Sequence, residues 1–152
     1  MKRICFIAST GGHLDQLMRL KPIMEKYNSF IVTEKTKYKL INNTNKSYYL
    51  YQVNRFERSW ILKMMINAII SLYIFLIKRP DIVISTGALA TIPMCIISKI
   101  FRRKLIFIES FAKINSPTLT GKLLYRFADE FYVQWEEMLK IYPKAIFKGG
   151  IY

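Results

Sequence analysis

Short apolar runs that end in small or polar residues alternate with helical segments along the whole chain. The clearest runs are Ile4–Ala8, Phe30–Thr33, Ile82–Ile84 and Leu105–Ile108. Runs that are apolar at every position, rather than at every second position, are typical of strands buried on both faces of a parallel sheet. Three shorter segments, 48–51, 131–133 and 145–147, predict further strands.

Apolar residues recur at helical spacing between these strands. The spacing predicts helices over residues 14–26, 60–77, 92–101, 117–127 and 136–141. Pro93 falls in the first turn of its helix, where a missing N–H costs nothing, and Asn42–Lys46 is a polar loop. The alternation of strand and helix predicts an α/β protein with a Rossmann-like, doubly wound parallel sheet.

The length and charge of the chain restrict its class and its partners. Its 152 residues suffice for one domain with a real core. The net charge is +14, and the section from Lys37 to Lys104, with 12 basic and 2 acidic residues, holds +10 of it. That section is also the most apolar, which favours an anionic membrane surface over nucleic acid as the partner. No nucleic-acid-binding motif is recognisable.

Metal and disulfide chemistry are not expected. Cys5 and Cys95 lie inside apolar runs and are predicted to be buried, reduced thiols, and His13 is the one histidine of the sequence. The apolar stretch Ile4–Ala8 is too short for the core of a signal peptide. We therefore expect a protein without metal or cofactor that stays on the cytoplasmic side.

The turn after the first predicted strand is a candidate ligand site, because ligands of open parallel sheets bind beyond the carboxyl ends of the strands. It reads Ser9, Thr10, Gly11, Gly12 and then His13. Glycines allow close approach of the backbone, and the start of the next helix offers free N–H groups, so a phosphate or diphosphate fits. The turn lacks the GxGxxG pattern of dinucleotide sites. A tight turn without a ligand is the alternative.

Two further strand ends have polar residues. Ser85, Thr86 and Gly87 repeat the strand–glycine–helix pattern, although the apolar residues that follow favour a structural turn there. Glu109 ends a fully apolar strand, where a carboxylate is costly unless it is paired or used. It could act as a base or orient a substrate, or it could bind a neighbouring backbone N–H.

The predicted helix 60–77 is apolar over most of its circumference. Its polar residues form one narrow stripe, and a helix packed on a sheet needs an apolar surface over only about a third of its circumference. A membrane span would place neighbouring strands on opposite sides of the bilayer, so we expect an interfacial helix. A partner-protein interface or a thick core is the alternative. The expected membrane contacts are Trp60, Lys63, Ile70, Phe75, Arg102 and Arg103.

Several stretches together resemble one protein family. They are Ser9–Leu17, Ser85–Gly87, Ile106–Ser110, Leu119–Tyr125, Ala128–Asp129, Phe131–Trp135 and Tyr142–Ala145. The chain resembles bacterial capsule and exopolysaccharide glycosyltransferase subunits, which are related to the membrane-anchor subunit of the eukaryotic dolichol-linked N-acetylglucosaminyltransferase. The resemblance implies that residues 1–152 form the N-terminal, acceptor-side half of a GT-B glycosyltransferase, and that a separate subunit binds the nucleotide sugar.

The resemblance also implies roles for the site residues. The chain would help to extend a polyprenyl-diphosphate-linked saccharide with a UDP-sugar, at the cytoplasmic face of the plasma membrane. The acceptor diphosphate would lie on the turn 9–12, helped by the turn 85–87. His13 could be the base or a hydrogen-bond donor, and Glu109 would orient His13 or the acceptor sugar. Gln16 stands where many relatives have glutamate, so no catalytic role is expected there.

Two alternatives of other classes remain open at this point. The chain could be a non-catalytic scaffold that recruits the partner enzyme to the membrane and raises its local concentration there. A basic nucleic-acid binder is the weaker alternative, because it rests on net charge alone.

Overall fold

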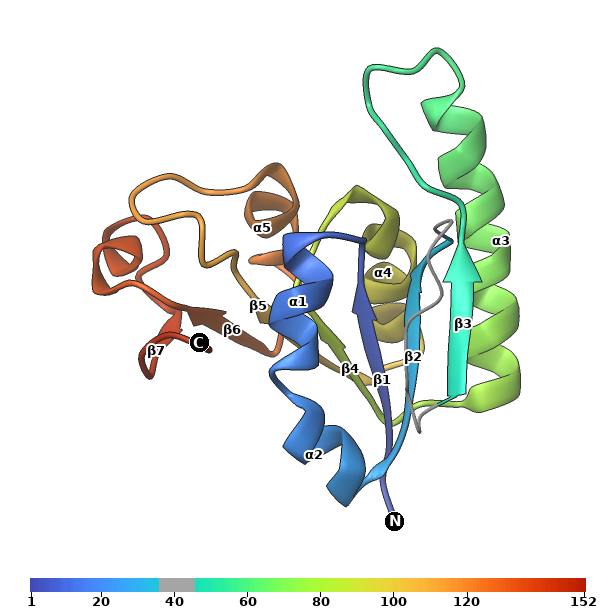
Figure 1. Ribbon diagram of the computed structural model, residues 1–152, viewed down its shortest axis with the longest axis horizontal. Helices are drawn as coiled ribbons and strands as arrows, with labels where there is room; N and C mark the ends of the chain where they lie inside the picture. Colours follow the sequence, from blue (N-terminus) through green and yellow to red (C-terminus); the bar gives the residue numbers. More distant parts are fainter. Residues whose placement is uncertain (36–45) are drawn as a thin grey trace.

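All seven strands form one parallel sheet in the computed structural model, which describes residues 1–35 and 46–152 (Figure 1). The strands are β1 (Arg3–Ala8), β2 (Asn28–Glu34), β3 (Lys46–Leu50), β4 (Ile82–Ser85), β5 (Lys104–Ile108), β6 (Glu130–Val133) and β7 (Ile146–Phe147). Their order is β3-β2-β1-β4-β5-β6-β7, and each neighbouring pair is parallel. The predicted fold class is confirmed. The predicted polar loop lies, apart from Lys46, outside the described residues.

The strand order reverses once, between β1 and β4. From β1 the chain builds outward through β2 to β3, and then crosses back to place β4 on the other side of β1. The carboxyl ends of β1 and β4 are therefore neighbours, with Ile7 paired to Ser85. This reversal is the position at which open α/β sheets bind their ligands.

The helices are α1 (Gly12–Met18), α2 (Lys21–Lys26), α3 (Trp60–Lys78), α4 (Ile92–Ile100) and α5 (Leu119–Leu124), with 3₁₀ helices η1 (Leu89–Thr91) and η2 (Glu136–Lys140). The single helix predicted over 14–26 is wrong, because the segment forms two short helices. Pro22 explains the break, since its ring would clash with the carbonyl of Met18 and it has no N–H to continue the ladder.

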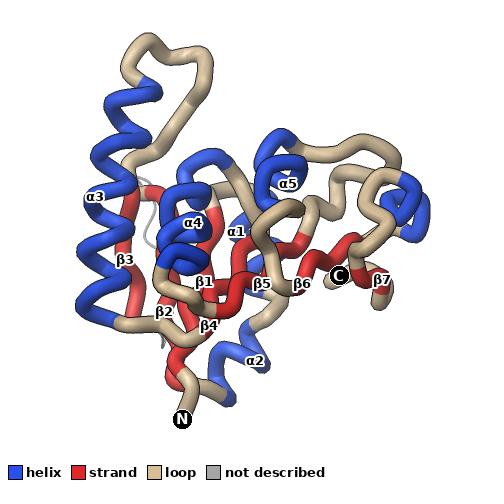
Figure 2. Tube along the Cα trace, turned by 180° about the vertical axis from the view of Figure 1, so that it is seen from behind, coloured by secondary structure: helices blue, strands red, loops and turns tan. Residues whose placement is uncertain are grey.

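The helices cover the two faces of the sheet unequally, as a comparison of Figures 1 and 2 shows. Alternate residues of β1 supply two cores: Cys5 and Ile7 pack with residues of α3, α4 and α5, whereas Phe6 and Ala8 pack with those of α1 and α2. Both cysteines are buried and free, as predicted, and burial raises the pKa of Cys95 to about 12.

Helix α3 has its polar stripe on the buried side. Asn67 and Ser71 are fully buried against the protein, next to Ile74 and Phe75. The opposite side exposes large apolar residues: Ile61, Leu62, Met65, Ile69, Leu72, Tyr73, Leu76 and Ile77. This distribution is the reverse of an ordinary amphipathic surface helix, which buries its apolar face.

The buried amide of Asn67 explains part of this reversal. Its side-chain oxygen accepts a hydrogen bond from Tyr51 N at 2.8 Å, and its Nδ2 donates to Tyr51 O at 2.8 Å. One side chain thus pairs both backbone groups of the residue that follows β3. The nearby Ser71 hydroxyl has no hydrogen-bond partner among the described residues.

We predict that Asn67→Ala lowers the free energy of unfolding by about 1–3 kcal/mol, because both polar groups of Tyr51 lose their partner. The control is Ser71→Ala, which removes a buried hydroxyl without a partner and should change stability by less than roughly 0.5 kcal/mol or increase it. Urea unfolding followed by circular dichroism measures both. Equal losses in the two variants would contradict this account.

Candidate functional site

The turns after β1 and β4 are joined by a reciprocal pair of hydrogen bonds. The ring nitrogen Nδ1 of His13 lies 2.7 Å from the carbonyl oxygen of Thr86, and the hydroxyl of Thr86 donates to the carbonyl oxygen of His13 at 2.7 Å. A third contact runs from Ser9 N to Gly87 O at 3.0 Å. These bonds fix the imidazole at the point where the strand order reverses.

The partner of Nδ1 determines which tautomer His13 adopts when it is neutral. A carbonyl oxygen only accepts hydrogen bonds, so Nδ1 must hold the proton in the bond to Thr86 O. The lone pair of the neutral ring then lies on Nε2. His13 is half-buried, and among the described residues no group engages Nε2.

Gly87 allows the imidazole to take this position. Its φ is +96°, and a Cβ at this residue would lie 3.3 Å from both Nδ1 and Cε1 of His13. Any side chain would therefore crowd the ring in a backbone conformation that already favours glycine. Gly87 has a packing role beside His13.

The expected diphosphate contacts through the side chains of Ser85 and Thr86 are wrong, because both residues are fully buried. Ser9 is 8% exposed, and its contact with a diphosphate stays a prediction. The hydroxyl of Ser85 donates to Thr91 Oγ1 and accepts from Gly87 N, and that of Thr86 is used by His13. These residues hold the turn and His13 in place, and no polar side-chain group of Ser85 or Thr86 is left for a ligand.

The last residue of β2, Glu34, is a site residue that the sequence reasoning missed. Its carboxylate is 5% exposed and accepts from Thr10 N and Thr10 Oγ1, each at 3.2 Å, and from Val53 N at 3.1 Å. The Thr10 amide, expected to contact a phosphate, is thus occupied. The signal in the sequence was a glutamate at the end of a buried strand.

Two residues of the glycine turn remain open to a ligand. Gly11 and Gly12 are exposed, and a Cβ at either position would meet no atom within 4 Å. In the described part of the chain, no hydrogen bond engages their backbone amides. Gly11 has a φ of +74°, which favours glycine in itself, whereas Gly12 has no such constraint. The open part of the predicted diphosphate site is therefore Gly11, Gly12 and the ring of His13.

Glu109 does not orient His13, so this expectation is wrong. Its carboxylate is 1% exposed and accepts from Ser110 N at 2.9 Å, from Thr118 through its hydroxyl at 2.8 Å and its amide at 3.2 Å, and from Tyr142 OH at 3.1 Å. Burial, and then the charge of Glu109, raise the pKa of Tyr142. The other reading of Glu109, a carboxylate that binds neighbouring N–H groups, is the correct one.

A buried amide network joins four segments at the same edge of the sheet. Gln134 Nε2 donates to Gln16 Oε1 at 3.0 Å and to Glu109 O at 2.8 Å, and Gln134 Oε1 accepts from Ile151 N at 2.9 Å. Gln16 is 4% exposed and has this structural role.

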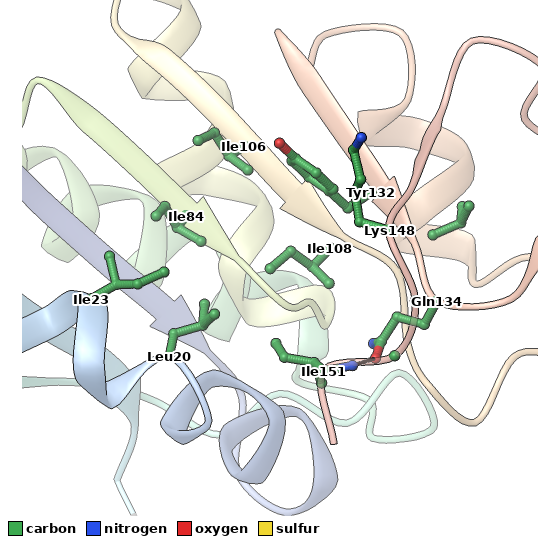
Figure 3. Close-up of a pocket in the computed structure, with 12 residues that line it drawn as sticks. Leu20, Ile23, Ile84, Ile106, Ile108, Tyr132, Gln134, Lys148 and Ile151 are labelled. Carbon is green, nitrogen blue, oxygen red and sulfur yellow. Dashed lines mark hydrogen bonds between the residues drawn. The ribbon is translucent and has the colours of Figure 1, made fainter.

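An apolar cavity of about 330 Å³ lies next to this network (Figure 3). Its floor is the face of β4, β5 and β6 that α1 and α2 leave uncovered, with Ile84, Ile106, Ile108 and Tyr132. Leu20 and the segment 148–151 form its walls. The crossovers after β4 and β5 place α4 and α5 on the opposite face, so the described helices do not cover this apolar patch.

The expected membrane contacts have different positions. Phe75 is 3% exposed and packs in the core, and Ile70 packs partly buried against it, so the expectation is wrong for Phe75. Trp60 and Lys63 are half-buried, and Lys63 is ion-paired with Glu57.

Basic side chains follow the far end of α4. Arg102 and Arg103 are exposed at the amino end of the sheet, and Arg103 reaches Asp81 at 3.5 Å.

Within the described residues, α3 alone is long and apolar enough to cross a bilayer, and 22% of its most apolar window is buried inside the protein. No group of three metal-ligating side chains occurs in the same residues.

Solved structures of similar fold define the class of this protein. MurG from Acinetobacter baumannii superposes with a TM-score of 0.74 at 14% identity, over 90% of this chain and 43% of that one. A UDP-N-acetylglucosamine 2-epimerase from Rickettsia bellii gives 0.77 at 11% identity, over 99% of this chain and 45% of that one. The chain is thus a Rossmann-like α/β protein of the type found in GT-B enzymes, and it spans less than half the length of these solved chains.

The family itself follows from the sequence. The chain matches the family "Oligosaccharide biosynthesis protein Alg14 like" over residues 4–151, and it belongs to that family. It is 23% identical to the "UDP-N-acetylglucosamine transferase subunit ALG14" of Homo sapiens over 97% of this chain and 82% of that protein. The subunit of the same name from Kluyveromyces lactis is 52% identical over 46 residues, or 30% of this chain and 20% of that one. The expected relation to the eukaryotic subunit is confirmed.

We predict that Gly121→Ala strongly destabilises the protein, because the new Cβ would lie 2.0 Å from Glu109 Oε2 and 2.9 Å from Thr118 Oγ1. Overpacking of this kind costs about 1–3 kcal/mol or more. Gly12→Ala is the matched control and should leave the unfolding temperature nearly unchanged, since its Cβ meets nothing within 4 Å. Differential scanning fluorimetry compares the two, and an unaffected Gly121→Ala protein would contradict the role given to Glu109.

Proposed function

We propose that this chain is the acceptor-side subunit of a two-component UDP-sugar glycosyltransferase. It would bind a polyprenyl-diphosphate-linked saccharide, and a separate subunit would bind the UDP-sugar, in the synthesis of a capsule or exopolysaccharide. The observation that supports this most is the fixed imidazole of His13, whose Nε2 is free and which directly follows the open Gly11–Gly12 turn at the strand reversal. The names of the human and yeast relatives suggest UDP-N-acetylglucosamine as the donor.

In this proposal the diphosphate of the acceptor lies against the amides of Gly11 and Gly12. The hydroxyl of the acceptor sugar attacks the anomeric carbon of the donor, a new C–O bond forms, and the bond to the UDP oxygen breaks. Nε2 of His13 takes the hydroxyl proton as the general base. The Thr86 carbonyl, 2.7 Å from Nδ1, then stabilises the imidazolium.

The separate subunit would complete the donor side of the site. MurG has less than half of its length matched by this chain, so the matched region corresponds to one part of a complete enzyme. The uncovered apolar face over β4, β5 and β6, with its cavity beside segment 148–151, offers a surface for that subunit. Because the partner would hold the UDP, we propose no metal or cofactor in this chain.

The apolar side of α3 would rest in the membrane interface. Its exposed residues would meet lipid, while Arg102 and Arg103 would face anionic headgroups from the end of α4. Both β3 and β4 lie in the same sheet, and α3 packs on that sheet through Asn67 and Ile74. We therefore propose a peripheral location on the cytoplasmic face of the plasma membrane rather than a span.

We predict that His13→Ala lowers kcat of the assembled pair by about 10²–10⁴-fold, the usual contribution of a general base. Gly12→Ala should lower transfer by at least about tenfold, because its Cβ would occupy space that the diphosphate needs although the free protein accommodates it. Radiolabelled sugar transfer to a polyprenyl-diphosphate saccharide measures both. A scaffold without catalytic residues would show full activity in both variants while pairing and membrane binding stay intact.

We also predict that Ile69→Asp weakens binding to vesicles of anionic phospholipid by about tenfold, since a charge would replace an apolar contact with the interface. Leu119→Asp serves as the control, because Leu119 is similarly exposed (65% against 70% for Ile69) but lies on α5. Vesicle co-sedimentation measures the partition. Equal binding by the two variants would remove α3 from the proposed membrane surface.

A further inference from the structure

An apolar groove of about 540 Å³ runs between the first halves of α3 and α4. These two helices lie side by side in both views of the chain (Figures 1 and 2). The lining residues are Trp60, Ile61, Met64, Met65, Ala68, Ile92, Pro93, Ile96 and Ile97. Apart from the indole N–H of Trp60, no polar side-chain group lines it. Its occupant would therefore make no hydrogen bonds with the lining side chains beyond that indole.

The groove opens at the same edge of the sheet as the candidate site. Both helices begin at the carboxyl ends of the strands, because each crosses back to start the next parallel strand, and Figure 1 shows the first turns of α3 beyond those ends. The α4 side of the groove is hydrogen-bonded to the turn that holds His13. Thr91, just before α4, donates its hydroxyl to Ala88 O at 2.7 Å and accepts a hydrogen bond from Ser85 Oγ at 3.2 Å.

Charge and surface around the groove indicate an anionic amphiphile. Arg55 and Arg58, both exposed, lie in the loop just before Trp60. Lys63 lies about one turn after Trp60 and is ion-paired with Glu57, the single acid in that stretch. Basic residues just before the start of an apolar groove complement a negatively charged head on a hydrocarbon tail. The groove is also continuous with the exposed apolar side of α3, since Ile61 and Met65 belong to both.

We propose that this groove binds the isoprenoid chain of the lipid-linked acceptor, next to its diphosphate. The inference rests on the proposed function and adds a binding subsite to it. The groove takes the first isoprene units out of the bilayer and so directs the diphosphate toward the Gly11–Gly12 turn. Met64 and Met65 suit this role, because unbranched thioether side chains adapt to an irregular hydrocarbon.

A photo-crosslinking experiment locates the lipid chain directly. The full chain, alone and with its partner subunit, is irradiated with a benzophenone-bearing farnesyl diphosphate, and the labelled peptides are identified by mass spectrometry. The proposal expects adducts within 60–68 and 92–97 that excess polyprenyl phosphate removes. Adducts spread over the whole exposed side of α3, or a groove that the partner subunit shields from the probe, would overturn it in favour of general membrane contact or a protein interface.

A matched pair of variants on α4 tests the consequence for turnover. Ile96→Asn places a polar group in the groove, whereas Ile100→Asn, one turn further and more exposed (70% against 37%), lies outside the lining. For a long-chain acceptor, we expect kcat/KM to fall about tenfold for Ile96→Asn and to stay within about twofold for Ile100→Asn. With a short-chain acceptor whose diphosphate carries a methyl group in place of the isoprenoid, nothing enters the groove, and Ile96→Asn should match the unaltered protein.

The outcomes separate this inference from the function on which it rests. Equal effects of the two variants, or an equal loss by Ile96→Asn on long and short acceptors, would overturn the chain-binding groove and leave the transferase in place. If the unaltered pair transfers to neither acceptor, the proposed function fails. Crosslinking in the groove then still reports on isoprenoid binding, because it requires no turnover.

Discussion

The reciprocal contact between His13 and Thr86 is the interaction on which the candidate site depends. It joins the turns after β1 and β4, the two strands between which the order of the sheet reverses. Gly87 gives the imidazole its space, and Glu34 holds the other side of the glycine turn through Thr10. Most polar groups near the turn therefore form hydrogen bonds within the protein that hold the turn in place. The exposed glycines and one ring nitrogen are what remains for chemistry.

The need to hydrogen-bond buried polar groups also explains the unusual surface of the chain. Helix α3 buries Asn67 because the backbone after β3 needs a partner for its N–H and C=O groups. Once the polar stripe faces inward, the apolar residues of the helix must face outward. An outward apolar surface of this size on a strongly basic chain is best satisfied by a lipid interface. In the proposed function, binding of a lipid-linked acceptor and location at the bilayer would then share one physical cause.

The sequence predicted the parallel sheet and its alternation with helices better than the side-chain contacts at the candidate site. Continuous apolar runs and the turns that end them define a parallel sheet, and the glycine turn with His13 marks its ligand-binding edge. The hydrogen-bond partners of buried polar groups could not be predicted from the sequence in the same way. Glu109 is bound by Tyr142, which lies 33 residues away and comes close only through the fold. Phe75 faces inward because the rotation of α3 is set by buried polar contacts, which an apolar periodicity does not encode.

Sugar transfer by the separated and recombined subunits tests the central claim most directly. UDP-N-acetylglucosamine and a polyprenyl-diphosphate-linked saccharide are supplied to this chain alone, to its cognate partner alone, and to a mixture of the two. The account predicts that lipid-linked product forms at an appreciable rate only in the mixture. Rapid transfer by this chain alone, or by the partner without it, would contradict the division of the active site between two polypeptides.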